Sequence, residues 1–217
     1  MPPFNYSILR LNRVIARSLP YQGVVVDLGC GEAPYRDEIL RSARTYIGVD
    51  WPASLHDRSK VDLVADLSAG VPLTTASVDT VVCFQSLEHV KEPSRLLVEC
   101  HRILRPGGRL LVTVPFMWHI HEEPNDYYRF TRFGLAYLLE QAGFDQIRIR
   151  ENTGFWQMWV LKFNYHTRRF SVGPLKLLFV PLWWVGQELA CFLDARDPSP
   201  EETASYTVSA EKRAGSV

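Results

Sequence analysis

A glycine turn directly after an apolar run is the first feature of this sequence that could bind a ligand. Residues 24–26 are three consecutive valines, which indicate a buried β-strand. They are followed by Asp27, Leu28, Gly29, Cys30 and Gly31. Because glycine has no Cβ and tolerates positive φ, the backbone of such a turn can approach a ligand closely. In an open α/β sheet the turn after the first strand lies where ligands bind, so we expect a nucleotide-like cofactor here.

A second segment, residues 119–131, is dense in groups that could bind a substrate or move a proton. We expect His121 to act as general base, because the unperturbed pKa of histidine is close to neutrality, with His89 as second choice. Tyr127, Tyr128 and Arg129 are expected to position the substrate, and Asp126 joins His121, Tyr127 and Arg129 as a candidate catalytic residue. The alternative is a structural ion pair between Asp126 and Arg129, with the tyrosines packed.

The same segment raises the question of a metal. His119 and His121 are two residues apart, as some metal ligands are. No third ligand is evident in the sequence, and the four cysteines form no Cys-x-x-Cys pair, so we expect no metal site.

These groups must be positioned by strands and helices that alternate along most of the chain. Apolar runs predict strands at 23–28, 46–50, 61–66, 78–84 and 110–114, a half-exposed strand around 147–149 and a last strand at 205–210. Helical spacing predicts helices at 8–19, about 34–42, 94–104 and 131–142, with Ser94 and Thr131 as N-caps. The alternation predicts an α/β fold with a largely parallel sheet and helices on both faces.

The spacing of the glycines bears on the type of cofactor. Dinucleotide-binding dehydrogenases carry Gly-x-Gly-x-x-Gly after the first strand. Here the third glycine is replaced by Pro34, which argues against NAD.

The form Asp-Leu-Gly-Cys-Gly at residues 27–31 instead resembles the first motif of the class I methyltransferases that use S-adenosylmethionine. Residues 64–67, 79–90 and 104–110 resemble later motifs of that family, in order. The pattern His-x-x-Pro-x-Asp-x-x-Arg-x-Thr that begins at His121 is similar to one in the small bacterial "type 11" methyltransferases. The resemblance covers about residues 22–151 and 205–211. It implies a Rossmann-like class I methyltransferase fold, with a seven-stranded, mostly parallel sheet and an antiparallel last strand.

The resemblance also implies which residues bind S-adenosylmethionine. Asp50, at the end of the second strand, would accept hydrogen bonds from both ribose hydroxyls, because a carboxylate is acceptor-only. Asp66 and Leu67 would face the adenine, and Gln85 and Leu87 would line the sulfonium end. The alternative for any acid that ends a short strand is a turn or cap residue. The implied set is Asp27, Gly29, Cys30, Gly31, Asp50, Trp51, Asp66, Leu67, Gln85 and Leu87.

Residues 153–203 form an apolar, Trp-rich insert between the last two strands. Its most apolar run, residues 177–185, is too short to span a bilayer, and basic residues lie just upstream. Tryptophan, apolar residues and Lys/Arg together suit a segment that lies in a membrane interface, here residues 155–193. The alternatives are a helical lid or a homodimer face packed on the sheet. We therefore divide the chain into an amphipathic helix (1–20), a methyltransferase core (21–152 and 204–212) and this insert.

The overall charge of the chain bears on whether it binds nucleic acid. Lys+Arg and Asp+Glu are 24 each, so no excess of positive charge points to nucleic acid. The widely spaced cysteines favour a reducing compartment, and arginines interrupt any signal-peptide core near the N-terminus. We expect a cytoplasmic protein, peripheral to the inner face of the membrane if the insert contacts lipid.

The expected function is transfer of a methyl group from S-adenosylmethionine to a small-molecule, glycan or lipid-linked acceptor. Two alternatives stay open at this point. One is a catalytically inactive cofactor-binding adaptor that acts through the apolar insert. The other is an NAD-type oxidoreductase on a related sheet.

Overall fold

The computed structural model describes residues 2–54 and 56–215, and its internal contacts group the chain into two units. The larger unit comprises residues 16–115, 120–150 and the chain from residue 206 onward. The smaller unit comprises the chain up to residue 15, residues 116–119 and residues 151–205. Helix α1 (Tyr6–Ser18), the predicted amphipathic opening helix, contributes residues to both.

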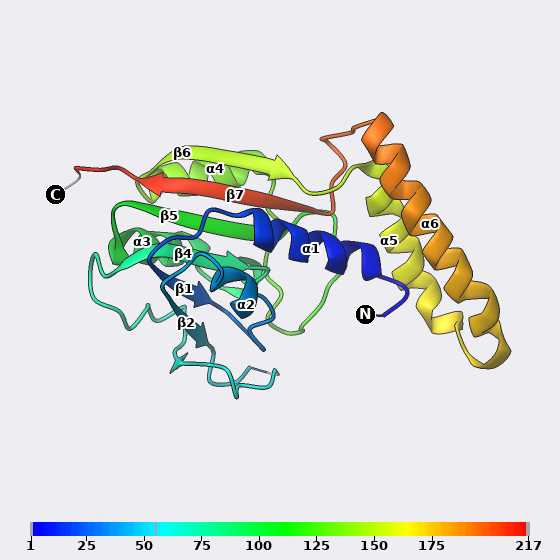
Figure 1. The fold of residues 1–217 in the computed structure, drawn as a ribbon, viewed down its shortest axis with the longest axis horizontal. Coiled ribbons are helices and arrows are strands. Elements are labelled where there is room, and N and C mark those ends of the chain that lie inside the picture. The colour runs from blue at the N-terminus through cyan, green and yellow to red at the C-terminus, as the bar shows by residue number, and fades with distance from the viewer. Residues whose placement is uncertain (1, 55, 216–217) are drawn as a thin grey trace. The chain divides into compact units, whose positions relative to one another are not determined.

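A seven-stranded sheet is the centre of the larger unit (Figure 1). Its order is β3-β2-β1-β4-β5-β7-β6, the pairings among β1 to β5 are parallel, and β7 is antiparallel. This confirms the predicted architecture. The strands are β1 (Val24–Leu28), β2 (Thr45–Asp50), β3 (Leu63–Val64), β4 (Val78–Phe84), β5 (Leu104–Pro115), β6 (Phe144–Glu151) and β7 (Ser205–Lys212).

The central strands form because their β-branched residues are buried on both faces of the sheet. Val25, Val26 and Val82 are fully buried, and Val25 and Val82 pack with Ile39 of helix α2 (Arg36–Ile39). Since β1, β2 and β4 are parallel neighbours, their carboxyl ends meet at one edge of the sheet. The predicted ligand-binding turns therefore lie side by side at that edge.

Two helices and one cap follow the sequence pattern closely. Helix α3 (Pro93–Ile103) corresponds to the helix predicted at 94–104, and it buries an apolar face that includes Leu96 and Leu97. Helix α4 (Arg132–Gln141) is capped as predicted, because the Thr131 hydroxyl accepts a hydrogen bond from the Gly134 N–H at 3.1 Å.

Several boundaries were predicted incorrectly. Strand β5 begins at Leu104 and not at Leu110, because Leu104 already pairs with Val78 of β4. Helix α2 has only four residues, and β3 has only two, although the sequence predicted longer elements at 34–42 and 61–66. The N-cap of α3 is Glu92 and not Ser94. The helix starts one residue earlier, at Pro93, whose missing N–H is tolerated in the first turn because it would have no intrahelical partner there.

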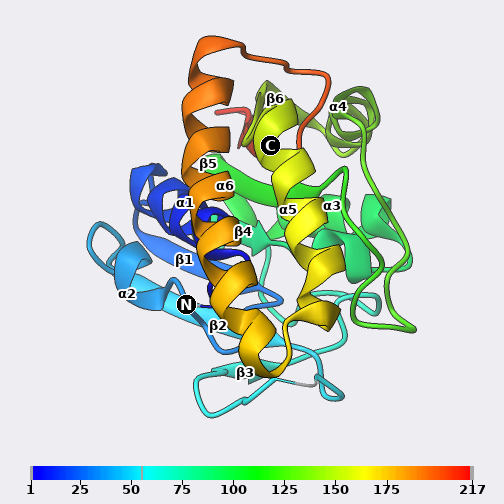
Figure 2. The same cartoon turned by 90° about the vertical axis from the view of Figure 1, so that its right-hand side faces the viewer.

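The smaller unit is built on two antiparallel helices, α5 (Phe155–Thr167) and α6 (Lys176–Arg196), which lie side by side (Figure 2). Two 3-10 turns, η2 (Arg168–Phe170) and η3 (Gly173–Leu175), connect them. The buried carboxylate of Asp194 accepts hydrogen bonds from the N–H groups of Gly154, Trp156 and Gln157 at 2.9–3.2 Å. It thereby satisfies donors at the start of α5 that have no partner within the helix.

The 24 residues Gly173–Arg196 are long and apolar enough to cross a membrane, by length and composition. Only 22% of the most apolar window is buried within the protein. The expectation that this segment is too short to span rested on residues 177–185 alone, and the structure shows that they belong to a longer helix. A core helix of a soluble protein can have the same length and composition. These two properties therefore do not by themselves show that the helix crosses a membrane.

Candidate active site

The turn after β1 is shaped by two glycines with positive φ. Gly29 has a φ of +73° and Gly31 a φ of +52°. A Cβ on Gly29 would lie 2.5 Å from the Cβ of Ser86, so only glycine fits there. Ser86 follows β4, and its hydroxyl donates to the carbonyl of Leu28 at 2.8 Å. The turn is thereby attached to the carboxyl end of β4.

Asp27 stands at the base of this turn and is buried. Its Oδ2 accepts a hydrogen bond of 2.7 Å from the hydroxyl of Tyr46 on β2. Burial raises the pKa of Asp27 to about 7, and the nearby carboxylate of Asp50 adds to the rise. The position suits a residue that holds the turn, because its carboxyl is bonded to Tyr46 inside the protein.

Asp50 carries the observation that bears most directly on a cofactor. It is the last residue of β2 and is 7% exposed. Its Oδ2 is buried and has no hydrogen-bond partner among the residues that the structure describes. A buried carboxylate oxygen of this kind is costly unless a donor reaches it. Two ribose hydroxyls would supply such donors, so the residue fits the group that the resemblance implies.

The other residues predicted for the cofactor differ in their surroundings. Trp51 is 39% exposed. Asp66 is exposed, and its Oδ1 accepts from the N–H of Ser68 at 2.9 Å, which is the turn role given above as the alternative. Cys30 is buried, with its N–H donating to the carbonyl of Val49 at 3.1 Å. Of these residues, Asp66 has the clearest structural explanation that needs no ligand.

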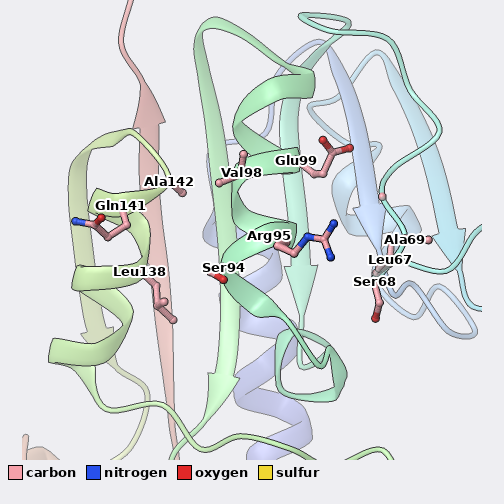
Figure 3. A pocket seen from close by; sticks show the side chains of 11 residues that line it. Leu67, Ser68, Ala69, Ser94, Arg95, Val98, Glu99, Leu138, Gln141 and Ala142 are labelled. Carbon is pink, nitrogen blue, oxygen red and sulfur yellow. The ribbon is translucent and has the colours of Figure 1, made fainter.

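A cavity of about 450 Å³ lies between α3, α4 and the segment after β3 (Figure 3). Leu67 is the only predicted cofactor residue that lines it. The glycine turn and Asp50 are not part of its wall. The residues that line it are Leu67, Ser68, Ala69, Gly70, Ser94, Arg95, Val98, Glu99, Leu138, Gln141 and Ala142.

Strain is stored at the carboxyl end of β4. Gln85 has a φ of +52°, a conformation that non-glycine residues rarely adopt, and its N–H donates to the carbonyl of Thr113 at 2.8 Å. Leu87, in the short 3-10 helix η1 (Leu87–His89), is fully buried. Strained backbone of this kind is concentrated at functional sites. Gln85 therefore remains a candidate to line the cofactor site, whereas the side chain of Leu87 is buried in the protein interior.

The segment after β5 is organised by one ion pair. Both terminal nitrogens of Arg129 contact the Asp126 carboxylate, at 2.6 and 2.7 Å. Asp126 also accepts from the N–H of His121 at 2.9 Å and lies 3.3 Å from its Nδ1. The Arg129 guanidinium holds the pKa of Asp126 well below its usual range. The ion pair that the sequence left as an alternative is thus present, and it orients His121.

The tyrosines of this segment lie near the surface. Tyr127 and Tyr128 are each 38% exposed. Their backbone N–H groups donate to the carbonyl of Glu88 at 3.0 and 3.3 Å, which ties the segment to η1. The Tyr128 hydroxyl donates to the carbonyl of Lys91 at 2.8 Å. Both rings could contact a substrate, and neither is buried as a packing residue.

Glu88 is a site residue that sequence reasoning missed. It is completely buried, and neither carboxyl oxygen has a hydrogen-bond partner within the described part of the chain. Burial raises the pKa of Glu88 to about 8. His89 Nε2 and His121 Nε2 lie 3.7 and 4.0 Å from its Oε1. The sequence did contain Glu88-His89 in the fourth-strand motif, but nothing in it indicated that Glu88 would be buried beside His121.

The predicted cofactor turn and the predicted acceptor segment are close in space. A Cβ on Gly31 would lie 3.5 Å from the ring of His56, and His56 Nε2 lies 3.4 Å from Glu122 Oε1. Glu122 is next to His121 in the chain. The structure therefore brings the glycine turn and the His121 segment to the same edge of the sheet.

Comparison with known proteins agrees with this geometry. Residues 26–112 match the type 11 family described as "Methyltransferase domain". A probable S-adenosylmethionine-dependent methyltransferase of Mycolicibacterium smegmatis is 42% identical over 96 residues, which is 42% of this chain and 37% of that protein. A ubiquinone biosynthesis O-methyltransferase of Paracidovorax citrulli is 35% identical over 105 residues, 41% of this chain and 42% of that protein. The chain thus spans about two fifths of the length of these curated relatives.

A solved structure shows the same fold over a larger share of the chain. It is an S-adenosylmethionine-dependent methyltransferase of Thermotoga maritima, described as a possible histamine N-methyltransferase. The TM-score is 0.61 at 18% identity, with 97% of this chain and 92% of that chain covered. At this level of identity the likeness concerns the fold alone.

Proposed function

Because residues 26–112 match the type 11 methyltransferase domain family, we propose that this chain transfers a methyl group from S-adenosylmethionine to a nucleophilic oxygen or nitrogen of an acceptor. The observation that carries the proposal is the buried Oδ2 of Asp50 beside the Gly29 turn, which has no hydrogen-bond partner in the described part of the chain. A nucleoside diol would supply the missing donors. The glycine turn would let the backbone lie against the methionine part of the cofactor.

Catalysis in this proposal is mainly alignment. A sulfonium is already a reactive methyl donor, so the protein must place acceptor, methyl carbon and sulfur in line and exclude water. Such positioning can contribute roughly 7–11 kcal/mol in favourable cases. His121 is the proposed proton acceptor, oriented by Asp126, and its removal would cost about 10²–10⁴-fold in rate. Tyr127 and Arg129 are proposed to position the acceptor.

The test separates cofactor binding from turnover. We expect S-adenosylhomocysteine to bind the purified chain in calorimetry and to raise its thermal midpoint, and we expect NAD to do neither. Methyl release from labelled S-adenosylmethionine, measured against acceptor pools of hydroxyl and amine compounds, tests the reaction. No binding of either nucleoside would refute the proposal. Binding with no turnover on any acceptor would favour the adaptor alternative.

The acceptor class and the location are proposed from the smaller unit. Helix α6 exposes a row of large apolar side chains, and exposed basic residues lie at the connection between α5 and α6. Apolar and cationic groups together favour the surface of a membrane that contains anionic lipids. We therefore propose a lipid-linked or membrane-embedded acceptor and action at the inner face of the membrane. The exposed apolar residues of α6 are Leu177, Leu178, Leu182, Trp184, Val185, Leu189 and Phe192.

Vesicle flotation tests this location. We expect the chain to float with vesicles that contain phosphatidylglycerol, and to float less when Leu178 and Leu182 are both replaced by glutamate. The control is Val98→Glu, which adds one of these two charges at a position that is 52% exposed on α3. Equal flotation of the double variant and the control would rule out α6 as the contact.

A further inference from the structure

We propose that Glu88, His89 and His121 form a binding site for a divalent transition-metal cation, for which Zn²⁺ is the best-suited ion. One carboxylate and two imidazoles are the protein ligands of a well-known type of catalytic zinc site, which keeps a fourth position open. The ligand atoms of the three residues all lie within 4.8 Å of one another. Glu88 and His89 belong to η1, and His121, from the segment after β5, is at least 32 positions away from them in the chain.

The buried carboxylate is the strongest reason to expect a cation. Glu88 is 0% exposed, and both of its oxygens are without a hydrogen-bond partner among residues 2–54 and 56–215. The Nε2 atom of His89 is also buried and has no hydrogen bond to any described residue. Acceptor atoms that face one another in a dry site repel unless a proton or a cation lies between them.

The hydrogen bonds on the far side of the imidazoles fit a metal. The Nδ1 of His89 lies 2.7 Å from the carbonyl oxygen of Asn125. A carbonyl only accepts, so Nδ1 carries the proton and the lone pair of Nε2 faces Glu88. The Nδ1 of His121 lies 3.3 Å from the carboxylate of Asp126 and 3.3 Å from Nη2 of Arg129. In the tautomer in which Nδ1 donates to Asp126, Nε2 carries the lone pair that can bind a metal, and a second carboxylate orients the imidazole.

The charges around the site are compatible with a cation. Arg129 Nη2 lies 3.3 Å from His121 Nδ1, but its charge is paired with Asp126. Glu122 Oε2 lies 3.8 Å from His89 Nε2 and is partly exposed, so it could supply a fourth ligand or admit water. Two glutamates and two neutral imidazoles would balance the charge of a divalent ion.

A cation here would change the chemistry of the proposed reaction, and only this step of the inference rests on the proposed function. An acceptor hydroxyl bound at the open position would lose its proton more easily, because a bound metal lowers the pKa of an oxygen ligand. His121 would then be a metal ligand and not the proton acceptor. The proton released from the bound hydroxyl would pass to the partly exposed Glu122 carboxylate or to water.

The experiment measures the metal directly, on the full chain and without an acceptor. Protein stripped with EDTA is dialysed against Zn²⁺ and analysed for bound metal, and Co²⁺ is added separately to record d–d absorption. We expect one ion per chain and a Co²⁺ spectrum of four-coordinate intensity. Glu88→Gln and His121→Ala should each weaken binding by more than about 100-fold, since even outer-shell changes cost roughly 10–100-fold.

Two control variants carry the same chemical changes away from the site. Glu123→Gln is exposed and next to Glu122, and His166→Ala lies on α5. Both should bind Zn²⁺ like the original chain. Binding of S-adenosylhomocysteine, measured for every variant, shows whether the larger unit is folded and keeps this test separate from that of the proposed function. The proposal is overturned if the stripped chain takes up neither ion, or if Glu88→Gln and His121→Ala bind Zn²⁺ as tightly as the controls.

Discussion

The carboxylate of Asp27 and the hydroxyl of Tyr46 share a hydrogen bond of 2.7 Å inside the larger unit, between β1 and β2. Burial raises the pKa of Asp27 to about 7 from an ordinary value of 3.8, and the charge of Asp50 adds to the shift. The hydrogen bond from Tyr46 opposes it. The folded protein therefore keeps this proton at pH values where the unfolded chain has already released it.

The sign of the pH effect follows from that difference. Between about pH 4 and pH 7 the native state binds more protons at Asp27, so its contribution to the free energy of unfolding falls as the pH rises. The full shift corresponds to a loss on the order of 4 kcal/mol across this window. Asp27→Asn is neutral at every pH and should lack this slope. Urea unfolding of both proteins from pH 4 to pH 8 checks it, and parallel profiles would contradict the assignment.

The two glycines of the turn should respond differently to alanine. Gly29→Ala combines a left-handed backbone with a contact of 2.5 Å to the Ser86 Cβ, whereas the nearest atom to a Cβ on Gly31 is 3.5 Å away. We expect Gly31→Ala to cost about 1–2 kcal/mol from backbone strain alone. Gly29→Ala should cost about 1–3 kcal/mol more. Thermal unfolding of the two variants measures the difference, and equal losses would contradict the steric argument.

Asp50→Asn should weaken the binding of S-adenosylhomocysteine. Loss of a hydrogen bond to a charged group costs about 1.5–3 kcal/mol, which corresponds to roughly 10–100-fold in affinity. Asp37→Asn, an exposed acid on α2, is the matched control and should bind normally. Calorimetry on both variants decides the matter. Unchanged affinity of Asp50→Asn would show that the ribose does not contact this carboxylate.

Asp194→Ala should loosen the α5–α6 helix pair. It removes an acceptor shared by the N–H groups of Gly154, Trp156 and Gln157. Leaving these donors unsatisfied should cost about 2–3 kcal/mol. Limited proteolysis should then cut residues 155–203 sooner than in Asp197→Asn, the control at an exposed neighbouring position. Equal cleavage rates would mean that the cap is not needed to keep the helices paired.

The sequence by itself determined the order of elements and the turn after β1. Runs of β-branched residues, the Thr131 cap and the glycines at 29 and 31 act through local sterics and hydrogen bonds, so short-range patterns are sufficient to identify them. The sequence did not predict the short lengths of α2 and β3. A short element persists only as far as its neighbours cover it, and that depends on packing.

Tertiary structure alone decided what surrounds each polar group. The burial of Glu88 beside His121 depends on which segments meet at the edge of the sheet. The pairing of Asp126 with Arg129 and the turn role of Asp66 are local contacts that the sequence offered as alternatives, and the structure shows that both form. Residues that are distant in the chain have no fixed spacing. A search of the sequence for closely spaced ligands therefore found His119 and His121 and missed Glu88. Desolvation then sets the charge of each group, because a carboxylate without water needs a donor, a proton or a cation.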